Sequence, residues 1–276
     1  MAAAFTALKD VVRINAQNWQ KTWSMAYIQF VKRYSGSALG GVWSLVKPIL
    51  FILVYWFAIA VGIRGGKPVG EVPYLFWLMP GILPWFFMSD AITSGGTSVL
   101  HNRQLVTKTL YPAATIPIFT LVSYLFTHVA LVALMLLVFL VSGQGLSIYS
   151  IQVVYYMFCM LALMAVVSIL FSALSAISRD VNHFLKAIQR VLLWLTPILW
   201  NLKELSPKAQ RLGIHYLVKL NPMTYIVEGY RDAMIYQRWF TEHWLYTIYF
   251  WALVLALALL SCYVFRKVER EFADIL

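Results

Sequence analysis

Seventy consecutive residues of this chain, Thr109 to Ser178, contain no aspartate, glutamate, lysine or arginine. Soluble domains carry about 25% charged residues, so a charge-free run of this length could not form an ordinary water-facing surface. A membrane-spanning helix needs roughly 20 apolar residues, and the run is therefore long enough for two spans. The sequence SGQG at residues 142–145 interrupts it near the middle. The run predicts a membrane hairpin.

The composition of the whole chain extends this interpretation. Hydrophobic residues make up 61% of the chain and charged residues only 12%, which is typical of an all-α integral membrane protein. The formal net charge of +11 does not indicate nucleic acid, because the basic residues cluster between apolar runs. Cys159 and Cys262 both lie inside apolar runs and are interpreted as packing residues rather than a disulfide framework.

Hydropathy predicts six transmembrane helices. Their approximate ranges are Pro48–Ile63 (with a start as early as Trp43), Val72–Ala91, Ala114–Val141, Ile148–Ile177, Phe184–Trp200 and Trp244–Phe265. An even number of spans places both termini on one side of the membrane. The chain is accordingly divided into an interface segment at residues 1–40, a six-span domain at 41–265 and a tail at 266–276.

Lysine and arginine indicate which side of the membrane is cytoplasmic. On the side of the termini lie 13 of them: Lys9, Arg13, Lys21, Lys32, Arg33, Arg103, Lys108, Arg179, Lys186, Arg190, Arg266, Lys267 and Arg270. The short loops on the opposite side contain only Arg64 and Lys67, and six more basic residues lie in the long segment 201–243. Short loops carry the positive-inside signal, so both termini are predicted to be cytoplasmic.

Three segments are predicted not to span. About Phe5–Tyr27, apolar residues gather near one helical face, which favours an amphipathic helix at the cytoplasmic interface or a helix packed on a partner. His101–Tyr111 is a short polar stretch between spans two and three. Between spans five and six, Ile214–Leu220 and Met223–Met234 are too short to cross, and Asn221 followed by Pro222 predicts a helix start. These are expected to be short helices that dip into the outer leaflet and pack against protein.

The chain lacks the sequence patterns of an energy-converting enzyme. It has no Walker A pattern for ATP, no HExxH and no cysteine cluster. Spans three and four offer only His128 as a titratable side chain of the kind that couples ions, and a lone histidine in a span is more often a hydrogen-bonded packing residue than a proton relay. A six-span protein without these features suggests that a separate polypeptide supplies the energy. His101–Tyr111 is then a natural docking element, although an ordinary solvated loop fits the same residues.

Four stretches carry a resemblance to a known family. RYSGSALGGVWSLVKPIL (Arg33–Leu50), GILPWFF (Gly81–Phe87), NRQLVTKTLYPAATIP (Asn102–Pro117) and LNPMTYIVEGYRDAMIY (Leu220–Tyr236) resemble, in order and spacing, permeases of bacterial ABC exporters of polysaccharides and teichoic acids. VYWFAIAVGIRGGKPV (Val54–Val69), PYLFWLMPGILPWFF and the ending EREFADIL resemble the wall teichoic acid permeases most. Capsular polysaccharide and O-antigen permeases share the core motifs and remain alternatives.

The resemblance implies a type-2 ABC exporter fold in the bacterial cytoplasmic membrane. Two copies of this chain would pair with two copies of an ABC ATPase, which would hold the ATP and Mg²⁺. No cofactor is expected on this chain. The substrate would be an undecaprenyl-diphosphate-linked polymer moved from the inner to the outer face. The resemblance also assigns the coupling helix to His101–Tyr111, with His101, Asn102, Arg103, Gln104, Leu105, Lys108 and Tyr111 as its contact residues.

The substrate pathway is predicted from residue chemistry. Lys32, Arg33 and Lys47 lie near the cytoplasmic start of span one and would attract a diphosphate head group, although the positive-inside rule explains them equally well. Aromatic side chains able to stack on sugars would line the path or form a gate; interfacial belts and core packing are commoner uses of such residues. These candidates are Tyr55, Trp56, Trp77, Trp85, Phe86, Trp194 and Trp200. Pro48 and Pro197 would bend spans one and five.

Glu228, Arg231 and Asp232 form an outer charged cluster. Their spacings of three and four residues place them on one face of a short helix, where a structural salt bridge or a role at the polymer exit is expected. An ion-driven glycan flippase is disfavoured because the spans lack paired carboxylates. A membrane-embedded glycosyl- or acyltransferase is disfavoured because the chain lacks a catalytic cluster.

Overall fold

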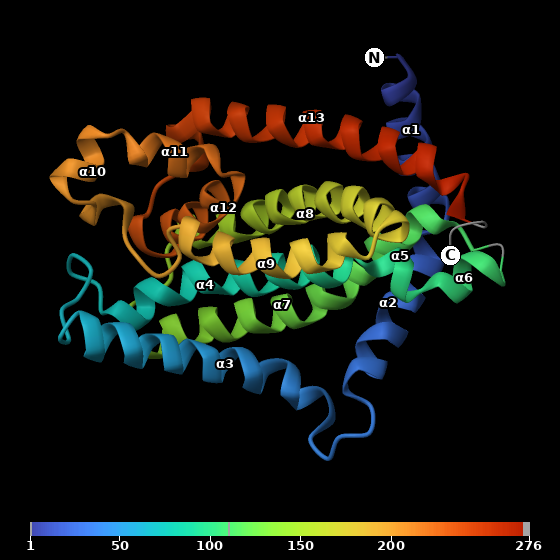
Figure 1. Cartoon of the computed structure of the whole chain (residues 1–276). Helices are drawn as coiled ribbons and strands as arrows, with labels where there is room; N and C mark the ends of the chain where they lie inside the picture. The colour runs from blue at the N-terminus through green and yellow to red at the C-terminus, as the bar shows by residue number, and fades with distance from the viewer. Residues whose placement is uncertain (1, 110, 273–276) are drawn as a thin grey trace.

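A computed structural model describes residues 2–109 and 111–272, and this part of the chain is all-helical, as predicted. Most of its long helices run side by side, whereas α1 (Ala2–Gln17) and α2 (Trp19–Tyr34) cross one end of the bundle (Figure 1). The last turns of α13 (Trp244–Glu269) lie beside α1 at this same end, which we call the α1 end. The short helices α10 (Pro207–Arg211) and α11 (Ile214–Leu220) lie at the opposite end.

Five helices of the described chain are long and apolar enough to cross a membrane. They cover Gly40–Ile63, Tyr74–Gly95, Ala113–Val141, Ile148–Ile177 and Phe240–Glu269. The first joins α3 (Trp43–Trp56) to the π-helix η2 (Phe57–Ile63), and the second joins α4 (Tyr74–Asp90) to the π-helix η3 (Ala91–Gly95). The charge-free run forms α7 (Ile116–Val141) and α8 (Gln152–Ile177), so the predicted hairpin is confirmed.

The fifth predicted span differs from the expectation. The helix there, α9 (Asp180–Leu195), has 16 residues and a length of about 24 Å, short of the roughly 30 Å hydrocarbon core. It ends because Pro197 disfavours helical geometry at the preceding residue, and Thr196 is extended (φ −88°, ψ 136°). Residues 2–109 and 111–272 therefore contain five such helices and not the six continuous spans that were expected. Pro197 terminates this helix instead of bending it.

The segment after α9 leaves backbone carbonyl groups that need donors. A helix end leaves its last carbonyls unpaired, and no water is available for them inside a bilayer. Arg231, at the end of α12 (Pro222–Arg231), donates from Nη1 to the Pro197 carbonyl at 2.5 Å and from Nη2 to the Ile198 carbonyl at 2.7 Å. The Tyr74 hydroxyl donates to the Leu199 carbonyl at 2.7 Å. Three successive carbonyl groups are thus capped by side chains from α12 and α4.

Arg231 is held in place by two further contacts. Its side chain is fully buried, its Nη1 pairs with Glu228 Oε1 at 2.7 Å, and its guanidinium lies 3.5 Å from the ring centroid of Trp77. Gly81 provides the space, because a Cβ at this position would lie 2.5 Å from Arg231 Nη2. A buried cation needs paired charge and hydrogen-bond acceptors. Glu228 supplies the charge, and the Pro197 and Ile198 carbonyls accept from Nη1 and Nη2, whereas Nε has no hydrogen-bond partner within the described chain.

The helix α12, which carries Glu228 and Arg231, begins where the sequence predicts. The side chain of Asn221 accepts a hydrogen bond from the backbone N–H of Met223 at 3.0 Å, with Pro222 at the first helical position, which confirms the predicted helix start. Asn221 also donates to Thr196 Oγ1 at 2.9 Å and so links α12 to the end of α9. α12 packs against α4 and α8 and is largely buried within the protein.

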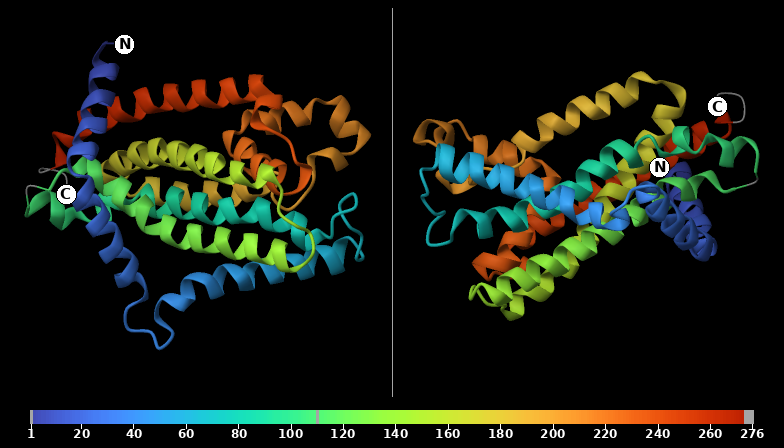
Figure 2. Two further views of the ribbon diagram at one scale, coloured as in Figure 1. Left: turned by 180° about the vertical axis from the view of Figure 1, so that it is seen from behind. Right: turned by 90° about the horizontal axis from the view of Figure 1, so that it is seen from below.

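The N-terminal helices turn small residues towards the protein. Their buried positions are Ala7, Val11, Thr22 and Ala26, whereas Phe5, Val12, Trp19 and Trp23 are exposed. Small residues allow the helices to approach the bundle closely, and the large apolar side chains are left for a lipid surface. The helix is interrupted at Asn18, so the single predicted helix forms two helices, α1 and α2. Both cross the end of the bundle (Figure 2).

Replacement of Arg231 by alanine should destabilise the fold. The substitution leaves the Pro197 and Ile198 carbonyls without donors and removes the partner of Glu228, for an expected loss of about 3 kcal/mol or more. We expect a lower thermal unfolding temperature of the detergent-purified protein and a lower yield of folded protein. Arg211→Ala, at an exposed position of α10, is the matched control. An unchanged unfolding temperature for Arg231→Ala would contradict the capping role.

Candidate functional site

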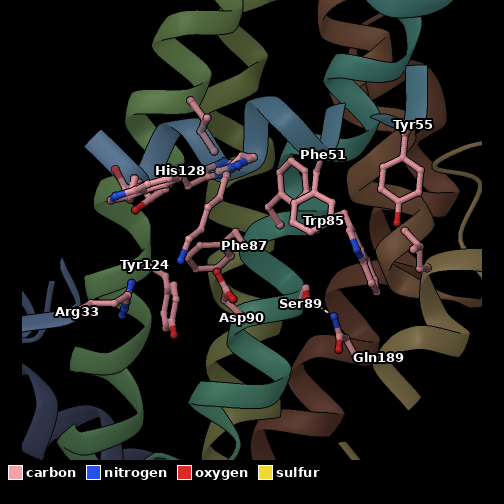
Figure 3. Close-up of a pocket in the computed structure, with 18 of the residues that line it drawn as sticks. Arg33, Phe51, Tyr55, Trp85, Phe87, Ser89, Asp90, Tyr124, His128 and Gln189 are labelled. Atoms are coloured by element: carbon pink, nitrogen blue, oxygen red, sulfur yellow. Dashed lines mark hydrogen bonds between the residues drawn. The ribbon is translucent and has the colours of Figure 1, made fainter. Parts of the chain in front are cut away.

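A cavity of about 520 Å³ opens between α3, α4, α7 and α9 at the side of the bundle (Figure 3). The end of α2 closes it towards the α1 end, through Arg33 and Tyr34. Three cationic side chains line it, from Arg33, Lys47 and Arg190, against one carboxylate, from Asp90. Its net positive lining and its aromatic walls suit a ligand that combines negative charge with a sugar or lipid surface.

Arg33 has a fixed orientation at the edge of this cavity. Its Nη2 donates to Ser123 Oγ at 2.7 Å, and its guanidinium lies 3.5 Å from the ring centroid of Tyr124. The Tyr124 hydroxyl in turn donates to Ser94 Oγ at 2.8 Å. Lys47 projects from an exposed position on α3. The structure therefore brings two of the three predicted head-group residues to one cavity, while the third, Lys32, lies outside it.

Three of the seven predicted aromatic pathway residues line the cavity. Tyr55 reaches it from α3, and Trp85 and Phe86 reach it from α4, with Phe51 beside Phe86 at a ring-centroid distance of 6.4 Å. The other predicted residues, Trp56, Trp77, Trp194 and Trp200, are not among its lining residues.

The outward position of Trp194 has a structural cause. Its side chain is 62% exposed on the outer face of α9, and its carbonyl accepts a hydrogen bond from Trp200 Nε1 at 2.9 Å. The prediction placed both tryptophans by residue type alone. Helical phase decides their direction, and the helix end at Leu195 moves Trp200 into the following loop.

The cavity also contains polar residues that the prediction missed. Asp90, Ser89 and Gln189 face one another across α4 and α9 in Figure 3, and Gln189 Nε2 donates to Ser89 Oγ. Tyr124 and Thr127 contribute from α7. A sequence signal existed, since each polar residue interrupts or borders an apolar helix, but only the fold shows that these interruptions share one cavity.

His128 is a packing residue at the inner wall of the cavity. Its Nε2 lies 2.8 Å from the Tyr230 hydroxyl in a buried hydrogen bond, and its ring lies 5.6 Å from that of Phe87. The geometry matches the expected role as a hydrogen-bonded packing residue. Within residues 2–109 and 111–272, no group of three or more histidine, cysteine or acidic side chains is placed to hold a metal ion.

The predicted coupling segment forms two short helices at the α1 end. These are α5 (Ser98–His101) and α6 (Arg103–Thr107), and the chain turns between them at Asn102. His101, Arg103, Gln104 and Lys108 are exposed, whereas Leu105 and Tyr111 pack against the bundle core. Residue 110 lies outside the described residues, as do residues 273–276 of the predicted tail and of the EREFADIL motif. α6 lies at the edge of the α1 end, beyond the long helices of the bundle (Figure 1).

The outer cluster separates into two environments. Arg231 is fully buried at the end of α9, whereas Glu228 and Asp232 line a second cavity of about 180 Å³ on the side of α10 and α11. Asp232 Oδ2 lies 3.8 Å from His243 Nε2. Glu228 and Arg231 form the expected salt bridge, and Glu228 shares the second cavity with Asp232, the first residue of the π-helix η7 (Asp232–Tyr236). The three charges do not form one cluster, because the Arg231 side chain turns to the end of α9.

The bundle, the interface helices and the exposed short helices at one end define a multi-pass membrane permease. The family model of ABC-2 type transporters matches residues 20–235, so this chain belongs to the ABC-2 type transporter family. The match includes α2, the cavity, the predicted coupling segment and the capped end of α9.

Named relatives of this chain are O-antigen export permeases. An O-antigen export system permease protein of Myxococcus xanthus is 25% identical over 214 residues, which cover 78% of this chain and 79% of that protein. One from Klebsiella pneumoniae is 25% identical over 245 residues, 88% of this chain and 90% of the relative, and another from this organism is 23% identical over 245 residues.

Cysteine labelling should separate the cavity from the lipid-facing surface. Thiolate is the reactive form of cysteine and requires water, so Tyr55→Cys should react with a charged thiol reagent whereas Trp194→Cys should react much more slowly. The native Cys159 and Cys262 are buried, and the unsubstituted protein gives the background. Equal labelling of the two variants would contradict the assigned cavity wall.

Proposed function

We propose that this protein is the membrane-spanning subunit of an ATP-driven exporter of lipid-linked polysaccharide. The observation that carries the proposal is the cavity between α3, α4, α7 and α9, in which cations and aromatic rings share one surface. Cations at its edge suit the diphosphate of a carrier lipid, and aromatic rings suit sugars that slide without tight binding. Membership of the ABC-2 type transporter family supports the same conclusion.

The O-antigen class of polymer is the better supported substrate. The relatives named above are O-antigen export permeases, and the alignments cover 78–88% of this chain. Wall teichoic acid is the second candidate, favoured by the stretches at residues 54–69 and 73–87 and by the chain ending. Both polymers are carried on a lipid diphosphate in this proposal, so the cationic edge of the cavity would serve either one.

The proposed assembly contains two copies of this chain and two copies of an ABC ATPase. The ATPase would hold ATP and Mg²⁺, and the exposed face of α5 and α6 would seat in its surface. In this arrangement the α1 end is cytoplasmic, which agrees with its excess of lysine and arginine. α9 together with the capped segment 196–200 would form the sixth crossing of the bacterial cytoplasmic membrane.

Charge reversal at the cavity edge tests the substrate path. Arg33→Glu and Lys47→Glu should each reduce ATP-dependent export of a lipid-linked polysaccharide by at least about tenfold, because a charge-assisted contact to phosphate contributes roughly 1.5–3 kcal/mol. The amount of co-purified ATPase should remain unchanged. Lys67→Glu, exposed in the loop before α4, is the control and should export normally. Normal export by both cavity variants would remove them from the path.

Charge reversal on α6 tests the energy source. Arg103→Glu places a carboxylate on the exposed face of the coupling segment and should lower both the recovery of the ATPase with this chain and ATP turnover by the complex. Lys208→Glu on α10, at the opposite end, should leave both unchanged. Transport by this chain alone, without an ATPase, would overturn the proposed function.

A further inference from the structure

A third cavity, of about 380 Å³, lies where α2 meets α5 and the start of α7. We call it the α2–α5 cavity. Every described residue that lines it is polar or charged, and none is an aspartate or glutamate. Lys32, Arg33 and His101 supply basic groups, and the Arg33–Tyr124 pair forms a common wall with the larger cavity. A basic, acid-free lining of this kind favours an anion.

Three buried polar atoms at this cavity have no hydrogen-bond partner within the described chain. They are Gln29 Oε1, Arg33 Nη1 and Ser98 Oγ. Buried polar groups are nearly always paired, and an unpaired one costs about 1–3 kcal/mol. The cavity is also much larger than the roughly 30 Å³ that one water occupies in liquid. The unpaired groups and the space together indicate a ligand.

Arg33 is pre-organised for a phosphate. Ser123 Oγ holds its Nη2 and the Tyr124 ring holds its plane, which leaves Nη1 free to donate. A planar guanidinium suits phosphate oxygens, and a fixed side chain loses little entropy when it binds. At the other side of the cavity, His101 Nδ1 donates to the Thr97 carbonyl at 3.0 Å. The other ring nitrogen, Nε2, takes no part in this hydrogen bond.

The position of the cavity indicates how its ligand arrives. The neighbouring surface of α2 exposes Trp23, Tyr27, Ile28 and Val31. Tryptophan and tyrosine are enriched at the level of lipid head groups, so α2 places the cavity at this depth. A phosphate at this depth is carried by a lipid.

We propose that the α2–α5 cavity binds a phosphate group carried by an amphiphile. Two lipids present this chemistry: the diphosphate of a polyprenyl carrier, an assignment that rests on the proposed function, and the head group of an anionic phospholipid. Because Ser98 and His101 belong to α5, an occupied cavity would tie the interface helix α2 to the predicted coupling segment.

The test is a binding measurement on the nucleotide-free complex of this chain with its ATPase in phosphatidylcholine nanodiscs. The probes are radiolabelled undecaprenyl diphosphate, phosphatidylglycerol and inorganic pyrophosphate. Arg33→Gln should weaken binding of at least one lipid probe by roughly tenfold or more, since it removes a charge-assisted donor. Arg211→Gln, exposed at the opposite end, should bind like the unsubstituted protein.

A second variant keeps the test independent of folding. Ser98 Oγ has no hydrogen-bond partner within the described chain, so Ser98→Ala should leave the unfolding temperature unchanged and weaken the same probe about fivefold, the equivalent of roughly 1 kcal/mol. Ser24→Ala, exposed on α2, is its control.

The probes distinguish the possible ligands. Loss confined to undecaprenyl diphosphate identifies the substrate, and loss confined to phosphatidylglycerol identifies a bound membrane lipid; both support the proposal. Unchanged binding of both lipids to Arg33→Gln and Ser98→Ala would overturn it, as would an effect on pyrophosphate alone. The binding measurement contains no ATP and does not depend on export. Its result therefore stands even if the complex does not export the polymer.

Discussion

The half of the bundle away from the α1 end depends on one buried arginine. α9 stops at Leu195, before a helix could cross the hydrocarbon core, and the chain that follows exposes successive carbonyl groups. Arg231 caps two of them and at the same time contacts Trp77 and Glu228. A fully buried cation is tolerated only where its donors and its charge are matched. The same contacts therefore fix the end of α9, the start of α4 and the orientation of α12.

This capping also shapes the main cavity. α9 and α4 form two of its walls, and their separation at the outer end is fixed by the Arg231 and Tyr74 contacts to residues 197–199. α3 forms a third wall and packs less tightly, since most of its apolar side chains face outward. The cavity thus has one wall held by buried polar contacts and one held mainly by apolar packing. Such an asymmetry allows α3 to move relative to α9 without loss of buried hydrogen bonds.

The sequence was sufficient for features that depend on local patterns. Hydropathy gave the hairpin of α7 and α8, and the Asn221-Pro222 pair gave the start of α12. The sequence was insufficient where tertiary contacts determine the position of a side chain or the end of a helix. Thr196-Pro197 did signal a helix end, but an apolar run on both sides concealed it. Trp194 and Trp200 were assigned by residue type, whereas helical phase turns Trp194 outward. Gln29, Ser98 and Tyr124 are far apart in the chain, so their shared cavity is visible only in the fold.

The charge-free run acquires a mechanical role from its hydrogen bonds. Two serines of α8 donate to the end of span two: Ser168 Oγ to the Ala91 carbonyl at 3.1 Å and Ser175 Oγ to the Gly96 carbonyl at 2.8 Å. Gly96 lies two residues before α5, Ala91 begins the π-helix η3 that leads to α5, and Asp90 of the main cavity directly precedes Ala91. A displacement of α5 and α6 would therefore act on α8 and on the cavity wall together. The run from Thr109 to Ser178 contains no aspartate, glutamate, lysine or arginine, so such a displacement would be transmitted by packing and hydrogen bonds rather than by ion pairs within the run.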